Sequence, residues 1–201
     1  MIKRLFDIFL SSIGIIASSP LWVIFPLAIK IEDRGPIFYF QERVGKRGRI
    51  FWAIKFRSMI NDAEKEIGPV QAVENDPRVT KVGKILRATA MDELPQLINI
   101  FKGDMSFVGP RALRPEEKEV YGSPEKRKIE DIPRYKKRLI VRPGLTGLTQ
   151  VYLSTDAPRP KKFRYDIVYI NRRTFLLDLK LILLSFIITF KGKWESREKK
   201  I

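Results

Sequence analysis

The sequence contains neither cysteine nor histidine. These absences exclude disulfide bonds, thiolate nucleophiles, imidazole bases and the usual zinc sites. Any catalysis must therefore use carboxylates, basic side chains, hydroxyl groups, or a hard metal ion such as Mg²⁺ bound through oxygen. The glycine-rich fingerprints of Rossmann folds and P-loops are also missing, and so is an Asp-x-Asp metal pair.

Acidic residues are few relative to basic ones. The 201 residues include 39 Lys and Arg but 23 Asp and Glu, which gives a net charge of +16. A surplus of this size indicates an anionic partner, namely nucleic acid, anionic lipid or a phosphorylated substrate. The length is sufficient for one domain with a real core and an appendage.

An uncharged, mostly apolar run of 22 residues extends from Ile8 to Ile29. A run of 18 or more such residues is a candidate membrane span. This run is too long and too interrupted for a signal peptide, and no cleavage site follows it. Basic residues flank it on both sides, so the positive-inside bias favours the cytoplasm for both ends. These residues are Lys3, Arg4, Lys30, Arg34, Arg43, Lys46, Arg47 and Arg49.

Ser19 and Pro20 form a candidate break within this run. Proline removes a backbone donor and clashes with the preceding helical turn, while the hydroxyls of Ser18 and Ser19 can bond the freed carbonyls inside lipid. The two arms, about 22 Å and about 15 Å long as helix, are each shorter than a hydrocarbon core of about 30 Å. The residues by themselves leave two alternatives open: a proline-kinked transmembrane helix, and a re-entrant helix with both ends in the cytoplasm.

The middle of the chain has the pattern of a short β-hairpin. The apolar runs 37–40 and 50–56 flank a loop that contains glycine, an arrangement that favours strand pairing. The polar segment 61–74 is expected to form a mobile loop or a short helix. A turn at 75–78 is followed by a short basic helix or strand over 79–87.

Two adjacent carboxylates, Asp92 and Glu93, precede a run with helical periodicity over 94–101. Thr89 stands three residues before Asp92 and fits a capping box, so Asp92 has an ordinary interpretation as a helix-capping carboxylate. The alternative is chemical. A carboxylate near a helix N-terminus and an arginine stays ionised, and it can then act as a nucleophile or a Mg²⁺ ligand. Adjacent helical residues point about 100° apart, so the two acids would have separate roles.

Turns further along the chain carry arginines. Arg111 and Arg114 follow the turn at 109–110, and Arg142 precedes a second Pro-Gly turn. Arginines held on rigid turns suit the binding of phosphate through paired hydrogen bonds. Solvated surface charge is the ordinary alternative for each of them.

Four segments together resemble the bacterial sugar transferases, the monotopic phosphoglycosyl transferases. The main one is DPRVTKVGKILRATAMDELPQLINIFKGDMSFVGPR over 76–111. KFRSM at 55–59, VRPGLTG at 141–147 and YDIVYINRRTFLLDLKLIL at 165–183 follow the family pattern in the same chain order. The resemblance extends over nearly the whole chain, whose length is that of the minimal catalytic members. Two stretches depart from the pattern and bear on substrate preference: Pro110-Arg111-Ala112 and Leu148-Thr149-Gln150.

The resemblance implies a specific activity and location. Such enzymes move a sugar 1-phosphate from a UDP-sugar to polyprenyl (undecaprenyl) phosphate, release UMP, require Mg²⁺ and pass through a covalent aspartyl intermediate, which initiates glycan assembly. They are monotopic proteins on the cytoplasmic face of the bacterial inner membrane, in contact with anionic phospholipid. Nucleic acid is not expected as a partner, and a homo-oligomer stays open. A non-enzymatic basic membrane-surface binding module, for which the charge and the tryptophans would suffice, is the rival function.

Individual residues take roles from the resemblance. Asp92 corresponds to the catalytic nucleophile and metal ligand. Glu93 corresponds to its partner, as a base, a metal ligand or an orienting group. Ser19 and Pro20 stand at the family's membrane break, and Lys3 and Arg4 at its basic anchor. The candidate phosphate and nucleotide contacts are Lys55, Arg57, Arg87, Arg111 and Arg142, with Asp166 as a second carboxylate near the site.

These inferences combine into an expected architecture. The fold class is α+β and mainly α, with a re-entrant membrane helix over 1–31 and a compact cytoplasmic catalytic domain over 32–201. The domain is expected to contain a short β-hairpin and interfacial amphipathic helices. The apolar helix over 174–190 is expected to pack on the domain or to lie in the membrane interface, with basic residues near anionic headgroups. These residues are Lys191, Lys193, Arg197, Lys199 and Lys200.

Overall fold

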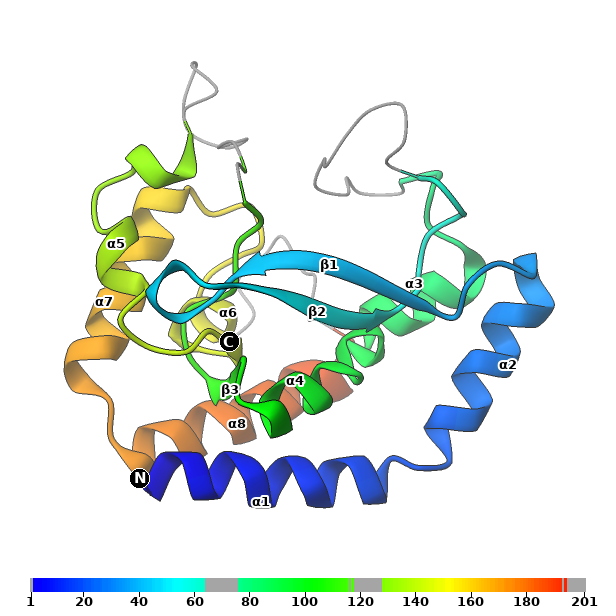
Figure 1. The fold of residues 1–201 in the computed structure, drawn as a ribbon, viewed down its shortest axis with the longest axis horizontal. Helices are drawn as coiled ribbons and strands as arrows, with labels where there is room; N and C mark the ends of the chain where they lie inside the picture. Colours follow the sequence, from blue (N-terminus) through cyan, green and yellow to red (C-terminus); the bar gives the residue numbers. More distant parts are fainter. Residues whose placement is uncertain (1, 64–75, 116, 118–127, 193, 195–201) are drawn as a thin grey trace.

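The computed structural model of the chain describes residues 2–63, 76–115, 117, 128–192 and 194. The fold is α+β and mainly helical, as predicted, with two small two-stranded sheets. In Figure 1, helix α1 (Ile2–Ala17) lies along the base of the molecule and α2 (Leu21–Asp33) rises along one side. The predicted segment 61–74 is described only at 61–63, and four of the five C-terminal basic residues lie outside the described residues.

The N-terminal apolar run forms two helices rather than one. The helices α1 and α2 meet at a bend of 60°. Pro20 is the N-cap residue of the second helix. The hydroxyl of Ser18 donates to the carbonyl of Ile15 at 3.3 Å, which is the kind of bond expected of a serine beside such a break. In the described part of the chain, no single helix has the length and hydrophobicity needed to cross a membrane, although this bent pair does when its two helices are taken together.

The predicted β-hairpin is confirmed. Strands β1 (Phe38–Val44) and β2 (Ile50–Phe56) pair antiparallel, joined by the short 3₁₀ helix η1 (Lys46–Gly48). Strand β1 extends four residues beyond the end of the apolar run at 37–40, because its polar second half pairs fully with β2. In this register Tyr39, Gln41 and Arg43 share one face with Lys55.

The basic segment after the hairpin forms helix α3 (Lys81–Ala88). The Thr80 hydroxyl accepts a hydrogen bond from Gly83 N at 2.9 Å, so Thr80 caps this helix and decides between the two predicted structures. The Glu32 carboxylate, at the end of α2, accepts the backbone N–H groups of Lys81 and Val82 at 2.6 and 2.9 Å. The first turn of α3 is thereby tied to α2.

The predicted capping box at Thr89 is wrong. The Thr89 hydroxyl donates backwards to the carbonyl of Ile85 at 2.8 Å and so belongs to the end of α3. The backbone then turns at Ala90, whose φ is 56°, and continues into the 3₁₀ helix η2 (Met91–Glu93). Helix α4 (Gln96–Lys102) begins only after Pro95 and ends at Gly103, whose φ of 97° favours glycine.

The second half of the chain supplies the second sheet and the remaining helices. Strand β3 (Ser106–Val108) pairs in parallel with β4 (Gly144–Thr146). A β-carbon at Gly144 would lie 2.0 Å from the backbone nitrogen of Gly109, so the approach of these two segments requires glycine. The other elements are η3 (Ile129–Asp131), α5 (Tyr135–Arg138), α6 (Leu148–Tyr152), α7 (Arg159–Arg172) and α8 (Phe175–Phe190).

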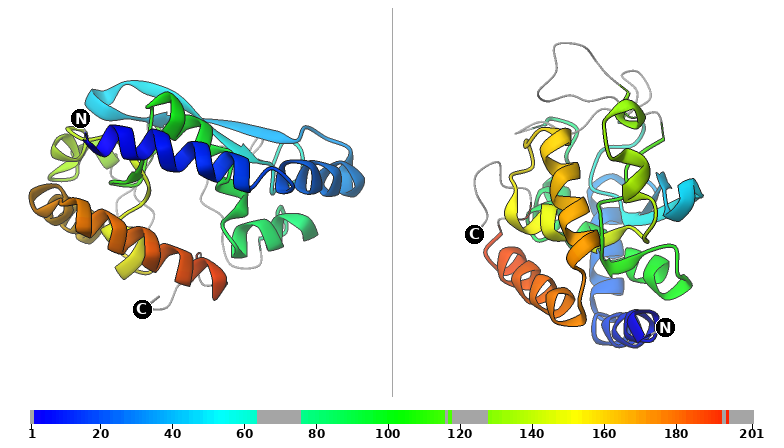
Figure 2. Two further views of the ribbon diagram at one scale, coloured as in Figure 1. Left: turned by 90° about the horizontal axis from the view of Figure 1, so that it is seen from below. Right: turned by 90° about the vertical axis from the view of Figure 1, so that its left-hand side faces the viewer.

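The main core lies between α4, the β3–β4 sheet, α7 and α8. Figure 2 places α1 and α8 at the same end of the molecule, where the rings of Phe6 and Phe175 pack edge to face with centroids 5.0 Å apart. Helices α1, α2 and α8 leave large apolar side chains exposed. On the N-terminal pair these are Ile2, Leu5, Phe9, Ile13, Ile16, Val23, Ile24, Leu27 and Ile31. On α8 they are Phe175, Leu176, Leu183, Phe186, Ile187 and Phe190.

Candidate active site

The adjacent acids Asp92 and Glu93 occupy the 3₁₀ helix η2 and are both buried, with 9% and 5% of their surface exposed. The left-handed turn at Ala90 directs the chain into this short helix and away from α3. Buried carboxylates are rare without a compensating charge, because burial disfavours the ionised form. The burial of both acids rules out solvated surface charge as the reason for this pair.

Glu93 is held by two cations that come from distant parts of the chain. Its Oε1 accepts hydrogen bonds from Lys55 Nζ at 2.7 Å and from Arg111 Nη2 at 3.1 Å. Burial acts to raise the pKa of the Glu93 carboxyl, but the charges of Lys55, Arg111 and Arg43 outweigh burial and hold this pKa well below its usual range. Glu93 is therefore ionised at neutral pH, and a proton-accepting role for it as a general base is disfavoured.

Lys55 also faces Asp92, with Nζ 3.9 Å from Oδ2. One ammonium group thus lies within ion-pair distance of both carboxylates of this short helix. Strand β2 carries Lys55 to this point, and its side chain is only 15% exposed. The hairpin therefore supplies a positive charge to η2 across a separation of 37 residues in the chain.

Arg43 is a further cation of this cluster that the sequence analysis did not select as a site residue. Its Nη1 donates to the carbonyl of Ala112 at 2.8 Å, and it also bonds the side chain of Gln41. Burial first, and then the neighbouring charge of Arg111, lower the pKa of the Arg43 guanidinium to about 10. The alternation of side chains along the hairpin, which puts Arg43 on the same face as Lys55, was the signal available in the sequence.

Arg111 reaches Glu93 from the turn that follows β3. Its backbone carbonyl accepts a hydrogen bond from Arg138 Nη2 at 2.8 Å, while Arg138 Nε donates to Asp166 Oδ2 at 2.6 Å. Asp166 also accepts a hydrogen bond from the hydroxyl of Thr149. Asp166 therefore holds Arg138, and Arg138 holds the backbone of Arg111. Asp166 forms an ion pair with Arg138 and not with a cation of the acid pair. A hollow in the surface adjoins Arg111 on this side, with Tyr135 among its lining residues.

Two of the remaining predicted phosphate contacts, Arg57 and Arg142, have partners away from the acid pair. Arg57 pairs with Asp33 at the end of α2, and Arg87 lies in the last turn of α3. Arg142 Nε donates to the carbonyl of Gly103 at 2.7 Å, at the far end of α4 from Glu93. The seven residues of α4 amount to about 10 Å of helix between these two points.

This separation predicts different consequences for two similar substitutions. We expect Arg111→Ala to lower turnover about a hundredfold, because it removes a charged donor beside the acids, and Arg111→Lys to restore only part of the rate. We expect Arg142→Ala to cost about 2 kcal/mol of unfolding free energy through the lost bond to Gly103, with a smaller effect on turnover. Steady-state kinetics measure the turnover of the three variants, and thermal unfolding measures their stability. A larger loss of turnover in Arg142→Ala than in Arg111→Ala would contradict the prediction.

Comparison with known proteins identifies the family of the chain. Residues 1–192 match the family model described as "Bacterial sugar transferase". The chain is 40% identical over 195 residues to the UDP-glucose:undecaprenyl-phosphate glucose-1-phosphate transferase of Klebsiella pneumoniae, with 94% of this chain and 40% of that protein covered. It is 34% identical over 196 residues to the exopolysaccharide production protein ExoY of Rhizobium meliloti (strain 1021), with 90% and 82% covered.

A further relative differs in its sugar. The UDP-N-acetylgalactosamine-undecaprenyl-phosphate N-acetylgalactosaminephosphotransferase of Aeromonas hydrophila is 40% identical over 184 residues, with 90% of this chain and 42% of that protein covered. The chain thus spans less than half the length of the Klebsiella and Aeromonas proteins but most of ExoY. Because the family match extends over nearly the whole chain, which contains the Asp92–Glu93 pair and its cations, the chain belongs to the bacterial sugar transferase family.

Proposed function

We propose that this protein transfers a sugar 1-phosphate from a UDP-sugar to polyprenyl phosphate, releases UMP, and thereby initiates the assembly of a glycan. The observation that carries the proposal is the buried pair Asp92 and Glu93 surrounded by Lys55, Arg111 and Arg43. Membership of the family and the printed activities of the Klebsiella and Aeromonas relatives support it. Those two relatives act on different sugars, so the choice of sugar is not part of the proposal.

The proposed reaction has two displacements at one phosphorus atom. An oxygen of Asp92 attacks the phosphorus bound to the sugar, the bond from that phosphorus to UMP breaks, and UMP leaves with the bonding electrons. A phosphate oxygen of polyprenyl phosphate then attacks the same phosphorus, and the carboxylate of Asp92 is released unchanged. Covalent catalysis of this kind divides one difficult transfer into two easier steps.

The neighbouring residues have roles that follow from their positions. Glu93 stays ionised and holds Lys55 and Arg111 by hydrogen bonds of 2.7 and 3.1 Å. These two cations then face the place where the diphosphate must approach Asp92, and fixed charges offset the charge that develops on phosphoryl oxygens. The side chain of Arg111 is 43% exposed, which leaves it accessible to a substrate.

The donor groups fit a magnesium ion that is shared with the substrate. Among the described residues, no three acidic side chains gather into a protein-only metal site. Mg²⁺ is commonly bound by one or two carboxylates together with substrate phosphates and water. Asp92 and the diphosphate would hold it here, and its charge would offset that of the diphosphate. Glu93 is the poorer ligand because Lys55 and Arg111 already occupy one of its oxygens.

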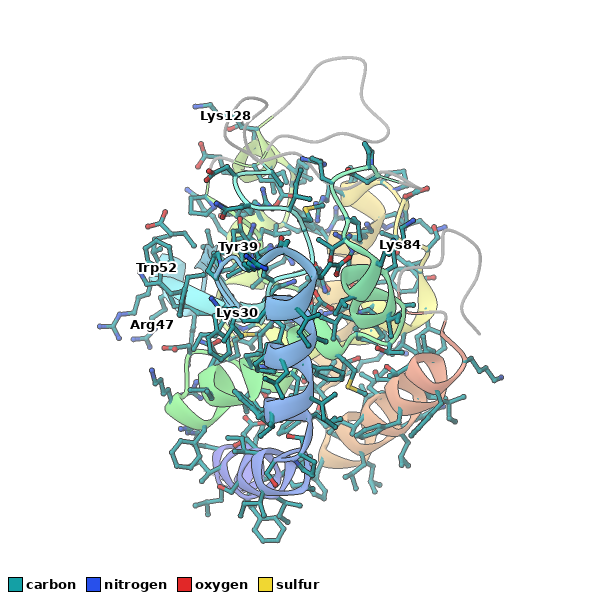
Figure 3. All side chains as sticks on the ribbon, turned by 90° about the vertical axis from the view of Figure 1, so that its right-hand side faces the viewer. Lys30, Tyr39, Arg47, Trp52, Lys84 and Lys128 are labelled. Atoms are coloured by element: carbon teal, nitrogen blue, oxygen red, sulfur yellow. The ribbon has the colours of Figure 1, made fainter. Side chains whose placement is uncertain are left out.

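The test of this function is UMP release in the presence and absence of polyprenyl phosphate. We expect catalytic release with a UDP-sugar, polyprenyl phosphate and Mg²⁺, and release of at most one equivalent without the lipid. A basic membrane-surface module would bind lipid and release no UMP. The tryptophans give that alternative little support. Trp52 is 56% exposed on the hairpin (Figure 3), whereas Trp194 is buried and Trp22 packs on Phe56. No UMP release with any of a panel of UDP-sugars would refute the proposal.

The proposed location is the cytoplasmic face of the bacterial inner membrane, with α1 and α2 as a re-entrant pair. The exposed apolar side chains on both helices, the 60° bend at Pro20 and the basic residues at both ends of the run support it. The exposed apolar side chains of α8 would lie in the same interface, near anionic phospholipid. This arrangement brings a cytosolic nucleotide sugar and a membrane-bound lipid phosphate to one site.

A single cysteine tests the topology, because the natural chain has none. We expect Ile2→Cys in intact cells to be unreactive toward a membrane-impermeant thiol reagent added outside, and to react after permeabilisation. Replacing Ser19 and Pro20 by alanine should relieve the break, straighten the helix and expose position 2 to the outside. Labelling of Ile2→Cys from outside in the otherwise natural chain would contradict the re-entrant arrangement.

A further inference from the structure

Two polar side chains of helix α1, Arg4 and Asp7, bind α4 and β3 of the globular part of the protein. Arg4 and Asp7 are three residues apart and therefore lie on the same side of the helix. Arg4 donates to the carbonyls of Ile100 and Phe101, both at 2.6 Å. These carbonyls belong to the last turn of α4, where a positive charge is also favoured by the helix dipole.

Asp7 binds a different element. Its Oδ1 accepts hydrogen bonds from the Ser106 hydroxyl at 3.0 Å and from the backbone N–H of Phe107 at 3.1 Å. Asp7 and Ser106 are each only 1% exposed. The carboxylate therefore fixes strand β3 from inside the protein, while Arg4, one turn away, fixes α4.

The two elements held in this way carry the two partners of an ion pair in the site. Glu93 lies just before α4, and Arg111 lies three residues after β3. Their side chains meet at 3.1 Å. Helix α1 also lies against the N-terminal half of α4, because a β-carbon at Gly14 would come within 3.1 Å of Leu97. Helix α1 thus contacts α4 near both of its ends.

We infer that Arg4 and Asp7 are positioning residues, which set the placement of Glu93 relative to Arg111 by holding α4 and β3 to one helical face. The inference rests on the proposed function, since it gives the Glu93–Arg111 pair its catalytic importance. It assigns to the first two turns of α1 a role beyond anchoring: the helix that carries the exposed apolar surface also aligns the site. A misplacement of about 1 Å costs up to about a hundredfold in rate when reacting groups must be oriented.

The experiment compares alanine with conservative variants in the full chain, in membranes and in detergent. We expect Arg4→Ala and Asp7→Ala to lower kcat about tenfold or more per folded enzyme. Asp7→Asn, which keeps the acceptor oxygen, and Arg4→Lys should recover most of that loss. Lys30→Ala is the matched control, because it removes an exposed cation of the same helix pair whose ammonium group donates to the nearby carbonyl of Arg34 at 3.3 Å (Figure 3). All variants should stay in the membrane fraction.

A double-mutant cycle separates positioning from simple structural support. If Asp7 places Arg111, then Arg111→Ala should lower kcat much less in the Asp7→Ala background than in the natural chain. Two results would overturn the inference while leaving the proposed function intact. One is a double mutant whose decrease in kcat equals the product of the decreases in the two single mutants. The other is a kcat per folded Asp7→Ala enzyme equal to that of the natural chain. Failure of the natural chain to release UMP would instead refute the proposed function and this inference with it.

Discussion

Replacing Asp92 by asparagine is expected to lower UMP release by at least about a thousandfold. The amide lacks the negative charge needed to attack phosphorus, and it is a poor ligand for Mg²⁺. The substitution keeps the size and the buried position of the side chain, so the fold should survive. The measurements are steady-state UMP release and the single-turnover release without polyprenyl phosphate, which Asp92→Asn should also lose.

Asp131→Asn is the matched control for this variant. It makes the same chemical change at an exposed carboxylate in η3, and it should leave turnover within about twofold of the natural rate, as surface substitutions usually do. A near-natural rate in Asp92→Asn would remove Asp92 from the role of nucleophile. Loss of turnover with retention of the single-turnover UMP release would assign the covalent step to another group.

The second large effect is expected at Asp166, as a loss of stability. The side chains of Asp166 and Arg138 are each 4% exposed, and Nε and Oδ2 lie 2.6 Å apart. Asp166→Ala would leave the Arg138 guanidinium buried beside Phe163 without its counter-charge. Removing one partner of a buried ion pair costs about 3–5 kcal/mol of unfolding free energy. Denaturant unfolding in detergent measures the loss.

Turnover should fall in the same variant, because Arg138 also donates to the backbone carbonyl of Arg111. Asp166→Asn is the informative companion. Its amide oxygen can still accept from Arg138, so we expect a smaller loss of stability and near-natural turnover per folded enzyme. Equal losses in the Ala and Asn variants would indicate that the charge of Asp166, and not its hydrogen bond, is what the site requires. An Asp166→Ala protein as stable as the natural one would contradict the prediction.

Local patterns in the sequence were sufficient to predict several secondary-structure elements. The alternating and apolar runs at 37–40 and 50–56 predicted the hairpin, because strand pairing across a short loop depends mainly on nearby residues. Pro20 predicted the break between α1 and α2, since its missing N–H acts on the adjacent turn wherever the chain lies. The apolar helix predicted over 174–190 was likewise observed, as Phe175–Phe190 with Thr174 as its N-cap.

Helix boundaries near the acid pair were predicted less well. Thr89 followed by Asp92 has the spacing of a capping box, but in the structure Thr89 is the C-cap residue of α3. The left-handed turn at Ala90 decides this outcome, and alanine gives no local signal for such a turn. A spacing rule cannot distinguish the end of one helix from the start of the next when a single residue between them reverses the backbone.

The sequence by itself determined the available chemistry: a chain without cysteine or histidine, with a carboxylate pair, an excess of cations and a broken apolar helix. Only the tertiary structure decided which charges meet. In the structure, Lys55 and Arg111 form ion pairs with Glu93. Arg142 binds the carbonyl at the end of α4, and Asp166 pairs with Arg138. An arginine at a turn looks the same in sequence whatever it binds. Its partner is set by which backbone segments, here 18 to 39 residues apart, the core packs side by side.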